Sequence, residues 1–191
     1  MNKRTNARFF AVTAAIFAFF AMDATAATYA DIINLAEYPE GFASAGQPLP
    51  EHYQAIANEG FQRVIYLAYA DQPETDIAND RAAHAAGLDY VQIAVRWDSP
   101  RPSDFATFAA ILNAADDKAF VHCQLNYRAS AFSFLYRVIY QGVTVADAKP
   151  ALDAVWRPND TWLRFMRTTL DQHGFAIDCA SCDWTVASAA D

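Results

Sequence analysis

The chain has 191 residues, of which 54% are hydrophobic, and its net charge is −8 at neutral pH. A chain of this length can bury a core of its own, and its acidic balance argues against general nucleic-acid binding, which needs a basic surface. An anion-binding site in this chain must therefore be built locally, against an unfavourable overall field.

Residues 1–26 have the three-part pattern of a secretory signal peptide. A basic start is followed by an apolar run over 9–22 and by Ala-Thr-Ala at 24–26, a small-x-small cleavage site. The apolar run is short for a membrane span of about 20 residues, although an uncleaved anchor is the alternative. We expect export to the periplasm or the medium with no lasting membrane insertion. The mature chain would begin at Ala27, or after Ala30 as a second option.

Apolar runs of strand length then alternate with helical periodicity. The expected strands are 64–68, 89–95 and 119–122, preceded by a short strand or extended segment over 29–35. The expected helices are 50–59, 75–86, 104–115 with Ser103 as its cap, 128–141, 145–155 with Pro150 bending or splitting it, and a last one from Asn159 or Asp160 to about 172. This alternation predicts a three-layer α/β/α sandwich with a mostly parallel central sheet.

We expect one domain over 27–175 and a C-terminal tail over 176–191 with little to pack. The tail carries Cys179 and Cys182 as a C-x-x-C pair, and the remaining cysteine of the chain is Cys123. Such pairs also occur in redox motifs and zinc sites, but an exported chain favours a disulfide between the two. The pairing leaves Cys123 as the single free thiol.

The strongest functional signal is the junction between strand 119–122 and helix 128–141. Ligands of parallel sheets bind at the carboxyl ends of strands, where a helix N-terminus attracts anions and favours a cysteine thiolate. Cys123 stands at this point, and Arg128 on the same loop can hold a tetrahedral oxyanion by two parallel hydrogen bonds. The junction therefore predicts nucleophilic cysteine chemistry on a phosphate or a similar anion.

The order His-Cys, then Arg, then Ser over 122–130 resembles the loop of the cysteine-dependent protein tyrosine and dual-specificity phosphatases. The resemblance covers roughly residues 40–173. It is greatest to the small bacterial phosphatase-like family associated with beta-lactamase-hydrolase-like proteins, in which a segment like 44–48 precedes the first helix and a strand like 64–67 follows. The resemblance implies a tyrosine-phosphatase-like fold and hydrolysis of phosphate monoesters.

In such a phosphatase, Cys123 attacks phosphorus and forms a phosphocysteine. The phosphate oxygens are then held by the Arg128 side chain and by the loop N–H groups of Gln124, Leu125, Asn126, Tyr127 and Arg128. Ser130 supplies a hydroxyl that helps the thiolate leave, and His122 orients the loop from behind. Asn126 stands near the position of the usual loop glycine, and asparagine tolerates a left-handed backbone better than most residues.

The resemblance also requires a general acid for the leaving oxygen, and Asp98 is the first candidate. It lies on a loop with Trp97 and Pro100, similar to the Trp-Pro-Asp loop of tyrosine phosphatases but with the order changed. Asp98 would donate a proton and then activate water. Alternatively it is a turn or cap residue, and Asp104 is the second candidate for the acid, although support of the next helix is its more ordinary role.

Two other functions remain open at this point. Four residues separate Cys123 from Arg128, which is also the loop length of rhodanese-like sulfurtransferases that carry a persulfide. The missing loop glycine would suit a non-catalytic phosphate-binding domain. We expect no cofactor and no metal, because His52, His84 and His173 show no metal-ligand spacing. The expected partner is a phosphorylated protein or small molecule, and the sequence leaves the oligomeric state open.

Overall fold

The computed structural model describes residues 27–70, 79–114 and 116–185. The expected signal peptide over 1–26 and the first residues of the helix expected over 75–86 lie outside the described residues. Among the helices of the described part, none combines the length and the apolar character that a membrane crossing requires.

A five-stranded sheet forms the middle layer. Its strands are β1 (Ala36–Tyr38), β2 (Phe42–Ala45), β3 (Arg63–Tyr66), β4 (Asp89–Gln92) and β5 (Ala119–His122). The spatial order is β1-β2-β5-β3-β4, with β1 antiparallel to β2 and the other neighbours parallel. The expectation of a mostly parallel sheet is confirmed, and β5 lies at its centre with the bounds the sequence predicts.

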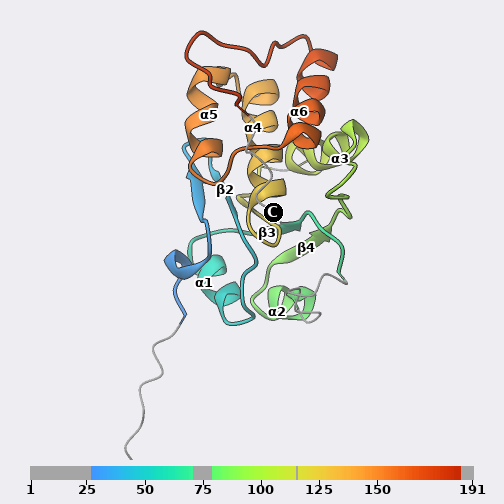
Figure 1. Cartoon of the computed structure of the whole chain (residues 1–191). Coiled ribbons are helices and arrows are strands. Elements are labelled where there is room, and N and C mark those ends of the chain that lie inside the picture. The colour runs from blue at the N-terminus through green and yellow to red at the C-terminus, as the bar shows by residue number, and fades with distance from the viewer. Residues whose placement is uncertain (1–26, 71–78, 115, 186–191) are drawn as a thin grey trace, which may run out of the picture.

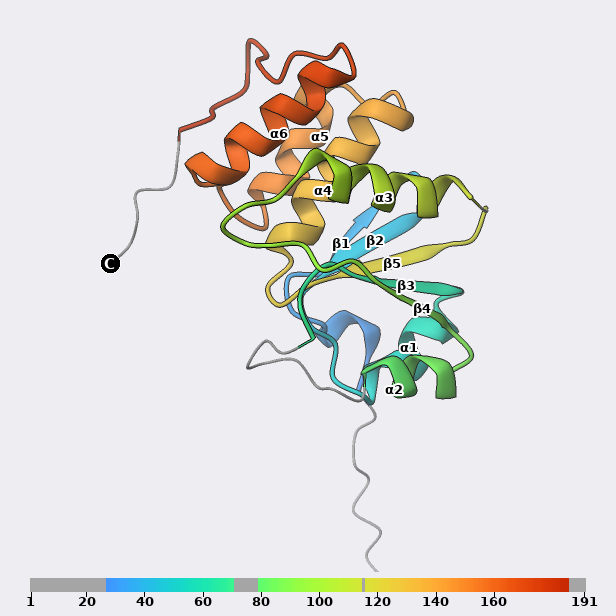
Figure 2. The same cartoon turned by 90° about the vertical axis from the view of Figure 1, so that its right-hand side faces the viewer.

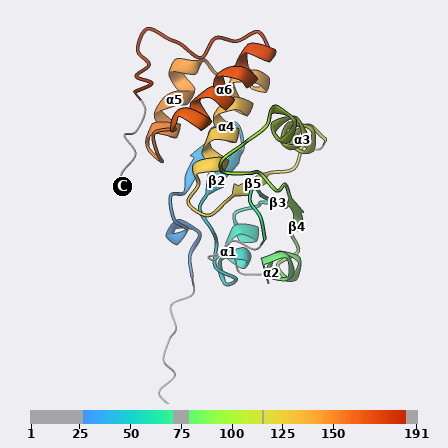
Figure 3. The same ribbon diagram turned by 45° about the vertical axis from the view of Figure 1, so that its right-hand side comes forward.

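Helices cover both faces of the sheet, which confirms the expected three-layer α/β/α sandwich (Figure 2). The 3₁₀ helix η1 (Tyr29–Asp31), α1 (His52–Asn58) and α2 (Asn79–Ala85) lie on one side. The other side carries α3 (Pro102–Asn113), α4 (Tyr127–Tyr140), α5 (Val145–Asp153) and α6 (Asp160–Gln172). Figures 1 and 3 show α4 in the middle of this second group, between the sheet and its neighbours.

Successive side chains of β5 point to opposite faces of the sheet. Val121 and Cys123 belong to the core under α3 to α6, whereas Phe120 belongs to the core against η1, α1 and α2. Full burial of a side chain such as Phe120 stabilises the fold by about 2–3 kcal/mol. The alternation fixes which neighbours of the cysteine lie on its side of the sheet.

Several boundaries differ from the sequence expectations. Residues 29–31 form η1 instead of a strand, and the edge strand β1 and its neighbour β2 were not predicted. Helix α3 begins at Pro102 with Arg101 as its N-cap, so the expectation of a Ser103 cap was wrong. Proline is favoured in the first helical turn because its fixed φ suits the helix and no N–H is needed there. Helix α5 continues through Pro150 without a break.

Helix α4 is buried around most of its circumference. Arg137 is only 7% exposed, and its guanidinium donates to both carboxylate oxygens of Glu40 at 3.0 and 3.2 Å. The guanidinium also lies 4.9 Å from the ring of Tyr38. These contacts tie the last turn of α4 to β1 and the β1–β2 turn.

Replacing Glu40 with glutamine should therefore destabilise the protein by about 2 kcal/mol, because it leaves a buried guanidinium without its counter-charge. Urea denaturation would measure this as a lower midpoint at an unchanged slope. Glu51→Gln is the matched control: Glu51 is exposed at the start of α1 and should change stability by less than about 0.5 kcal/mol. Equal stabilities of the two variants would refute the structural role of the Glu40–Arg137 pair.

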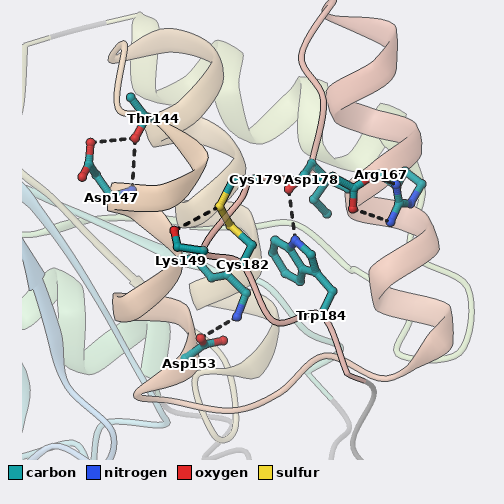
Figure 4. Close-up of a disulfide and its surroundings, with 11 residues drawn as sticks. Thr144, Asp147, Lys149, Asp153, Arg167, Asp178, Cys179, Cys182 and Trp184 are labelled. Carbon is teal, nitrogen blue, oxygen red and sulfur yellow. Dashed lines mark hydrogen bonds and ion pairs between the residues drawn. A yellow bond between two sulfur atoms is a disulfide. The ribbon is translucent and has the colours of Figure 1, made fainter.

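The C-terminal segment packs on the domain, contrary to the expectation of a tail with little to pack. Cys179 and Cys182 form the expected disulfide, shown in Figure 4. The ring of Trp184 contacts Phe134 edge to face at 5.8 Å, and its indole N–H donates to the carbonyl of Ile177 at 3.0 Å. The segment therefore packs against the core beside the middle of α4.

Candidate active site

A pocket of about 260 Å³ opens where β5 ends and α4 begins. Its lining residues are Trp97, Cys123, Gln124, Leu125, Tyr127 and Arg128. The structure thus brings the expected nucleophile, the expected arginine and three of the expected loop residues to one pocket. Trp97 was not expected to line it. The first turn of α4 points its unpaired N–H groups toward this end of the helix.

The loop after Cys123 turns into α4 at Asn126. This residue is the N-cap of α4 and has a left-handed backbone with φ 67°, as its replacement of the usual glycine predicts. Its side-chain amide donates to the carbonyl of Asn34 at 2.6 Å, and the Asn34 amide donates to the carbonyl of Leu125 at 3.0 Å. These two reciprocal hydrogen bonds fix the loop against the segment that contains Asn34. The role of Asn34 was not predicted.

Gly46 belongs to segment 44–48, which resembles the family, and backbone hydrogen bonds of this segment support the same loop. Its N–H donates to the carbonyl of Ile33 at 2.7 Å, and the next N–H, of Gln47, donates to the carbonyl of Gln124 at 3.0 Å. A Cβ at position 46 would lie 2.3 Å from Ile33 Cγ2 and 2.9 Å from the Gln124 carbonyl oxygen. Only glycine fits at this close approach.

Gly46→Ala is therefore expected to displace the loop and lower kcat/KM for an aryl phosphate at least about tenfold. Gly41→Ala is the matched control, since Gly41 lies in the β1–β2 turn with φ 90° and nothing within 4 Å of an added Cβ. It should lose about 1 kcal/mol of stability through backbone strain and keep its kcat/KM. Unchanged kcat/KM in Gly46→Ala would contradict the assigned role of Gly46.

Arg128 is buried and held in place by two contacts. Its Nε–H donates to the carbonyl of Val95 at 3.1 Å, and its guanidinium carbon lies 5.3 Å from the centre of the Trp97 ring. A guanidinium fixed in this way presents its remaining donors in one orientation, which suits binding of a tetrahedral anion. The position of Arg128 fits the phosphate-binding role that the resemblance implies.

His122 is fully buried and stacks on Tyr66 with ring centres 4.8 Å apart. Neither ring nitrogen has a hydrogen-bond partner within the described part of the chain. Burial lowers the pKa of His122 to about 3, so the imidazole is neutral at physiological pH. His122 therefore does not act as a base for Cys123, and its location fits support of the loop from behind.

Ser130 and Tyr127 make local contacts in the first turn of α4. The Ser130 hydroxyl donates to the carbonyl of Tyr127 at 3.2 Å. The Tyr127 ring stacks on Trp156, with centres 4.7 Å apart and planes 9° apart. In this arrangement the serine hydroxyl is bonded to the helix backbone, so its expected help to the leaving thiolate requires a rotation of that side chain.

The structure does not bring Asp98 to the Cys123 pocket. Its carboxylate accepts two hydrogen bonds from Arg96, at 2.9 and 2.8 Å, and its side chain is 69% exposed. The hydrogen bonds from Arg96 hold the pKa of Asp98 below its usual value. The second candidate, Asp104, accepts from the Arg101 N–H and guanidinium at the start of α3, which is the helix-supporting role expected as its alternative.

An aromatic cluster that the sequence did not predict surrounds the pocket. Trp97, Tyr127, Trp156 and Trp162 contact one another with ring centres 4.7 to 6.1 Å apart. The indole N–H of Trp162 donates to the carbonyl of Trp97 at 3.0 Å, which ties the Asp98 loop to α6. The sequence offered one signal for this cluster. Trp97 stands beside the candidate acid, and Tyr127 stands within the loop after Cys123.

A central parallel sheet with a cysteine and an arginine at the N-terminus of α4 defines the architecture of the protein-tyrosine-phosphatase-like enzymes. A family model described as "Beta-lactamase hydrolase-like protein, phosphatase-like domain" matches residues 34–139. The chain belongs to this family. No curated protein matches the chain.

Solved structures of phosphatase fold match most of the chain. A DUF442 protein from Shewanella putrefaciens is 26% identical, with a TM-score of 0.68 over 75% of this chain and 95% of its own. TpbA from Pseudomonas aeruginosa in complex with phosphotyrosine is 14% identical, with a TM-score of 0.57 over 71% and 83%. The core catalytic domain of the PP-IP phosphatase SIW14 from Saccharomyces cerevisiae is 13% identical, with a TM-score of 0.58 over 70% and 83%.

The family makes the protein a phosphatase-like enzyme, a phosphoric monoester hydrolase. The more distant solved structures show the tyrosine-phosphatase-like fold. Within the described part of the chain, no group of three or more His, Cys, Asp or Glu side chains is placed to hold a metal ion.

Proposed function

We propose that the protein is an exported phosphatase that hydrolyses phosphate monoesters through a phosphocysteine at Cys123. The observation that carries this proposal is the shared pocket of Cys123 and Arg128 at the N-terminus of α4. The helix N-terminus and the guanidinium supply positive potential where the phosphate binds and where charge develops in the transition state.

The reaction takes two displacements at phosphorus. The Cys123 thiolate forms an S–P bond as the P–O bond to the leaving group breaks, and the leaving oxygen takes a proton from Asp98. A water molecule then gives a proton to the Asp98 carboxylate and attacks phosphorus, which breaks the S–P bond and regenerates the thiolate. Arg128 and the loop N–H groups hold the phosphoryl oxygens through both steps.

This scheme requires Asp98 to leave Arg96 and reach the leaving oxygen. The Arg96–Asp98 pair is exposed on both sides, and such pairs contribute little stability. Trp97, the residue before Asp98, already lines the Cys123 pocket, so a local change in the 96–100 loop is sufficient. Away from Arg96, the pKa of Asp98 rises toward its ordinary value, which makes the carboxyl a better proton donor.

The pocket walls indicate the class of substrate. Trp97, Leu125 and Tyr127 line the pocket, and the side chains of Trp97 and Leu125 are partly exposed at its rim. Flat apolar walls around a phosphate site suit an aryl phosphate, because aromatic rings stack favourably on one another. We therefore propose phosphotyrosine-like or small aryl phosphates as substrates.

The competing function is sulfur transfer, which the four-residue spacing between Cys123 and Arg128 favours. Purified mature protein would be tested on phenyl phosphate and, separately, on thiosulfate with cyanide. The proposal predicts phosphate release and no thiocyanate. Thiocyanate formation without phosphate release would establish a sulfurtransferase, and vanadate binding with neither turnover would establish a non-catalytic domain.

One observation supports export, and a second supports the position of cleavage. The partly buried disulfide between Cys179 and Cys182 suits an oxidising compartment. Tyr29 is buried against Phe61 at 5.7 Å between ring centres, so cleavage after Ala30 would remove a core residue. We expect the protein in the periplasm or medium, with Ala27 as its N-terminal residue in sequencing of the purified mature chain. An intact N-terminus on protein recovered from the cytosol would contradict export.

A further inference from the structure

A second pocket of about 250 Å³ adjoins the Cys123 pocket. Its lining residues are Tyr69, Arg96, Trp97, Asp98 and Arg128. Trp97 and Arg128 line both pockets, so a molecule whose phosphate reaches Cys123 can extend past Trp97 into the second. The scheme above uses this second pocket only as the resting place of Asp98.

The second pocket carries positive charge in a chain whose net charge is −8. Arg96 and Arg128 line it, and Arg101 follows on the same proline-containing loop, outside the lining of the pocket. The side chains of Arg96 and Arg101 are 55% and 65% exposed, and each guanidinium is paired with an aspartate, Arg96 with Asp98 and Arg101 with Asp104. A concentration of arginines against the overall field indicates an anion-binding role.

We propose that Arg96, assisted by Arg101, forms a second anionic subsite, and that the preferred substrates carry a carboxylate or a second phosphate near the scissile phosphate. The inference rests on the proposed phosphatase function and adds the chemistry of the substrate. The second anion takes the place of Asp98 on Arg96. Asp98 is thereby released toward the leaving oxygen when a substrate of this class is bound.

The exchange is chemically balanced, because one carboxylate leaves the Arg96 guanidinium as another anion binds to it. Arg96 holds Asp98 through Nε and one terminal nitrogen, the two-point geometry in which guanidinium also binds a free carboxylate or phosphate. The pair joins residues two positions apart on an exposed loop, so little stability is lost when it opens.

The test compares 3-carboxyphenyl phosphate and 1,3-phenylene bisphosphate with the neutral analogue 3-carbamoylphenyl phosphate. For the wild type we expect kcat/KM to be about tenfold higher for the anionic substrates, mainly through a lower KM. A comparison of 3-carboxyphenyl phosphate with 1,3-phenylene bisphosphate shows whether the subsite prefers a carboxylate or a second phosphate. Arg96→Gln should reduce the preference to near unity and Arg101→Gln should reduce it in part. Arg81→Gln, an exposed arginine on α2 across the sheet, should keep it.

The outcomes separate this inference from the function on which it rests. Equal kcat/KM for all three substrates in the wild type would overturn the second subsite and leave the phosphatase standing. A preference that survives Arg96→Gln would overturn the assignment to Arg96. Phosphate release from none of the three would overturn the proposed function and this inference together.

Discussion

Phosphate release from phenyl phosphate is expected to fall by roughly a thousandfold or more when Cys123 is replaced by serine. A serine hydroxyl at this position has no base to remove its proton, since His122 lies fully buried with a pKa lowered to about 3. The substitution changes the side-chain volume little, so the protein should fold and still bind vanadate. Steady-state assays with a thermal melt measure both properties.

The control for Cys123→Ser is the double variant Cys179→Ser/Cys182→Ser. It removes the other two cysteines of the chain, which form a disulfide on the C-terminal segment outside the pocket. This variant should lose some stability and keep most of its kcat/KM. Phosphate release that survives Cys123→Ser would refute the phosphocysteine mechanism.

The second large effect is expected for Asp98→Asn, and it should depend on the leaving group. Phenolate needs a proton as it departs, so kcat/KM for phenyl phosphate should fall about a hundredfold or more. 2,4-Dinitrophenolate departs without protonation, so kcat/KM for its phosphate should change severalfold at most. Parallel assays of the two esters therefore test proton donation by Asp98. In the structure, Asp98 is instead paired with Arg96.

The pH dependence provides a second readout of the same residue. Donation requires a protonated Asp98, so the rate with phenyl phosphate should decline as the pH rises through the pKa of Asp98. Pairing with Arg96 lowers that pKa, so Arg96→Gln should move the decline to higher pH. Asp98→Asn should remove the decline.

Asp104→Asn is the control, because Asp104 is the other candidate acid and pairs with Arg101 at the start of α3. It should lower stability without any dependence on the leaving group. If the loss of kcat/KM depended on the leaving group in Asp104→Asn and not in Asp98→Asn, Asp104 would be the general acid in place of Asp98.

The centre of the fold could be predicted because its determinants are local. Strand 119–122 is a short apolar run, and the helix that follows ends before Gly142. The left-handed backbone of Asn126 follows from the need for such a residue where the loop turns into α4. These features depend on neighbours in the sequence, and they contain the proposed nucleophile, Cys123, and Arg128.

The parts that could not be predicted depend on contacts between distant segments. Strands β1 and β2 are three and four residues long, and β2 joins the rest of the sheet only through its pairing with β5, far along the chain. The Asn34–Asn126 pair joins residues 92 positions apart. Trp184 looked like part of a polar tail because its partner, Phe134, lies on α4, far away in the chain. Sequence periodicity carries no information on such pairs.

The same reason explains the resting state of Asp98. Its position on a proline-bounded loop marked it as a candidate acid, but the orientation of the loop follows from the hydrogen bond between Trp162 and the Trp97 carbonyl and from the pair with Arg96. Arg96 was visible in the sequence as a neighbouring charge. Its bidentate contact with Asp98 is a property of the folded loop.

The most direct test of the account is to trap the covalent intermediate. The wild-type protein would be mixed with a large excess of 2,4-dinitrophenyl phosphate, quenched within milliseconds in denaturant, digested and analysed by mass spectrometry. We predict the mass of one phosphoryl group on the peptide that contains Cys123 and none on the same peptide of Cys123→Ser. Turnover with an unmodified Cys123 peptide, or with the phosphoryl group on another residue, would contradict the central claim.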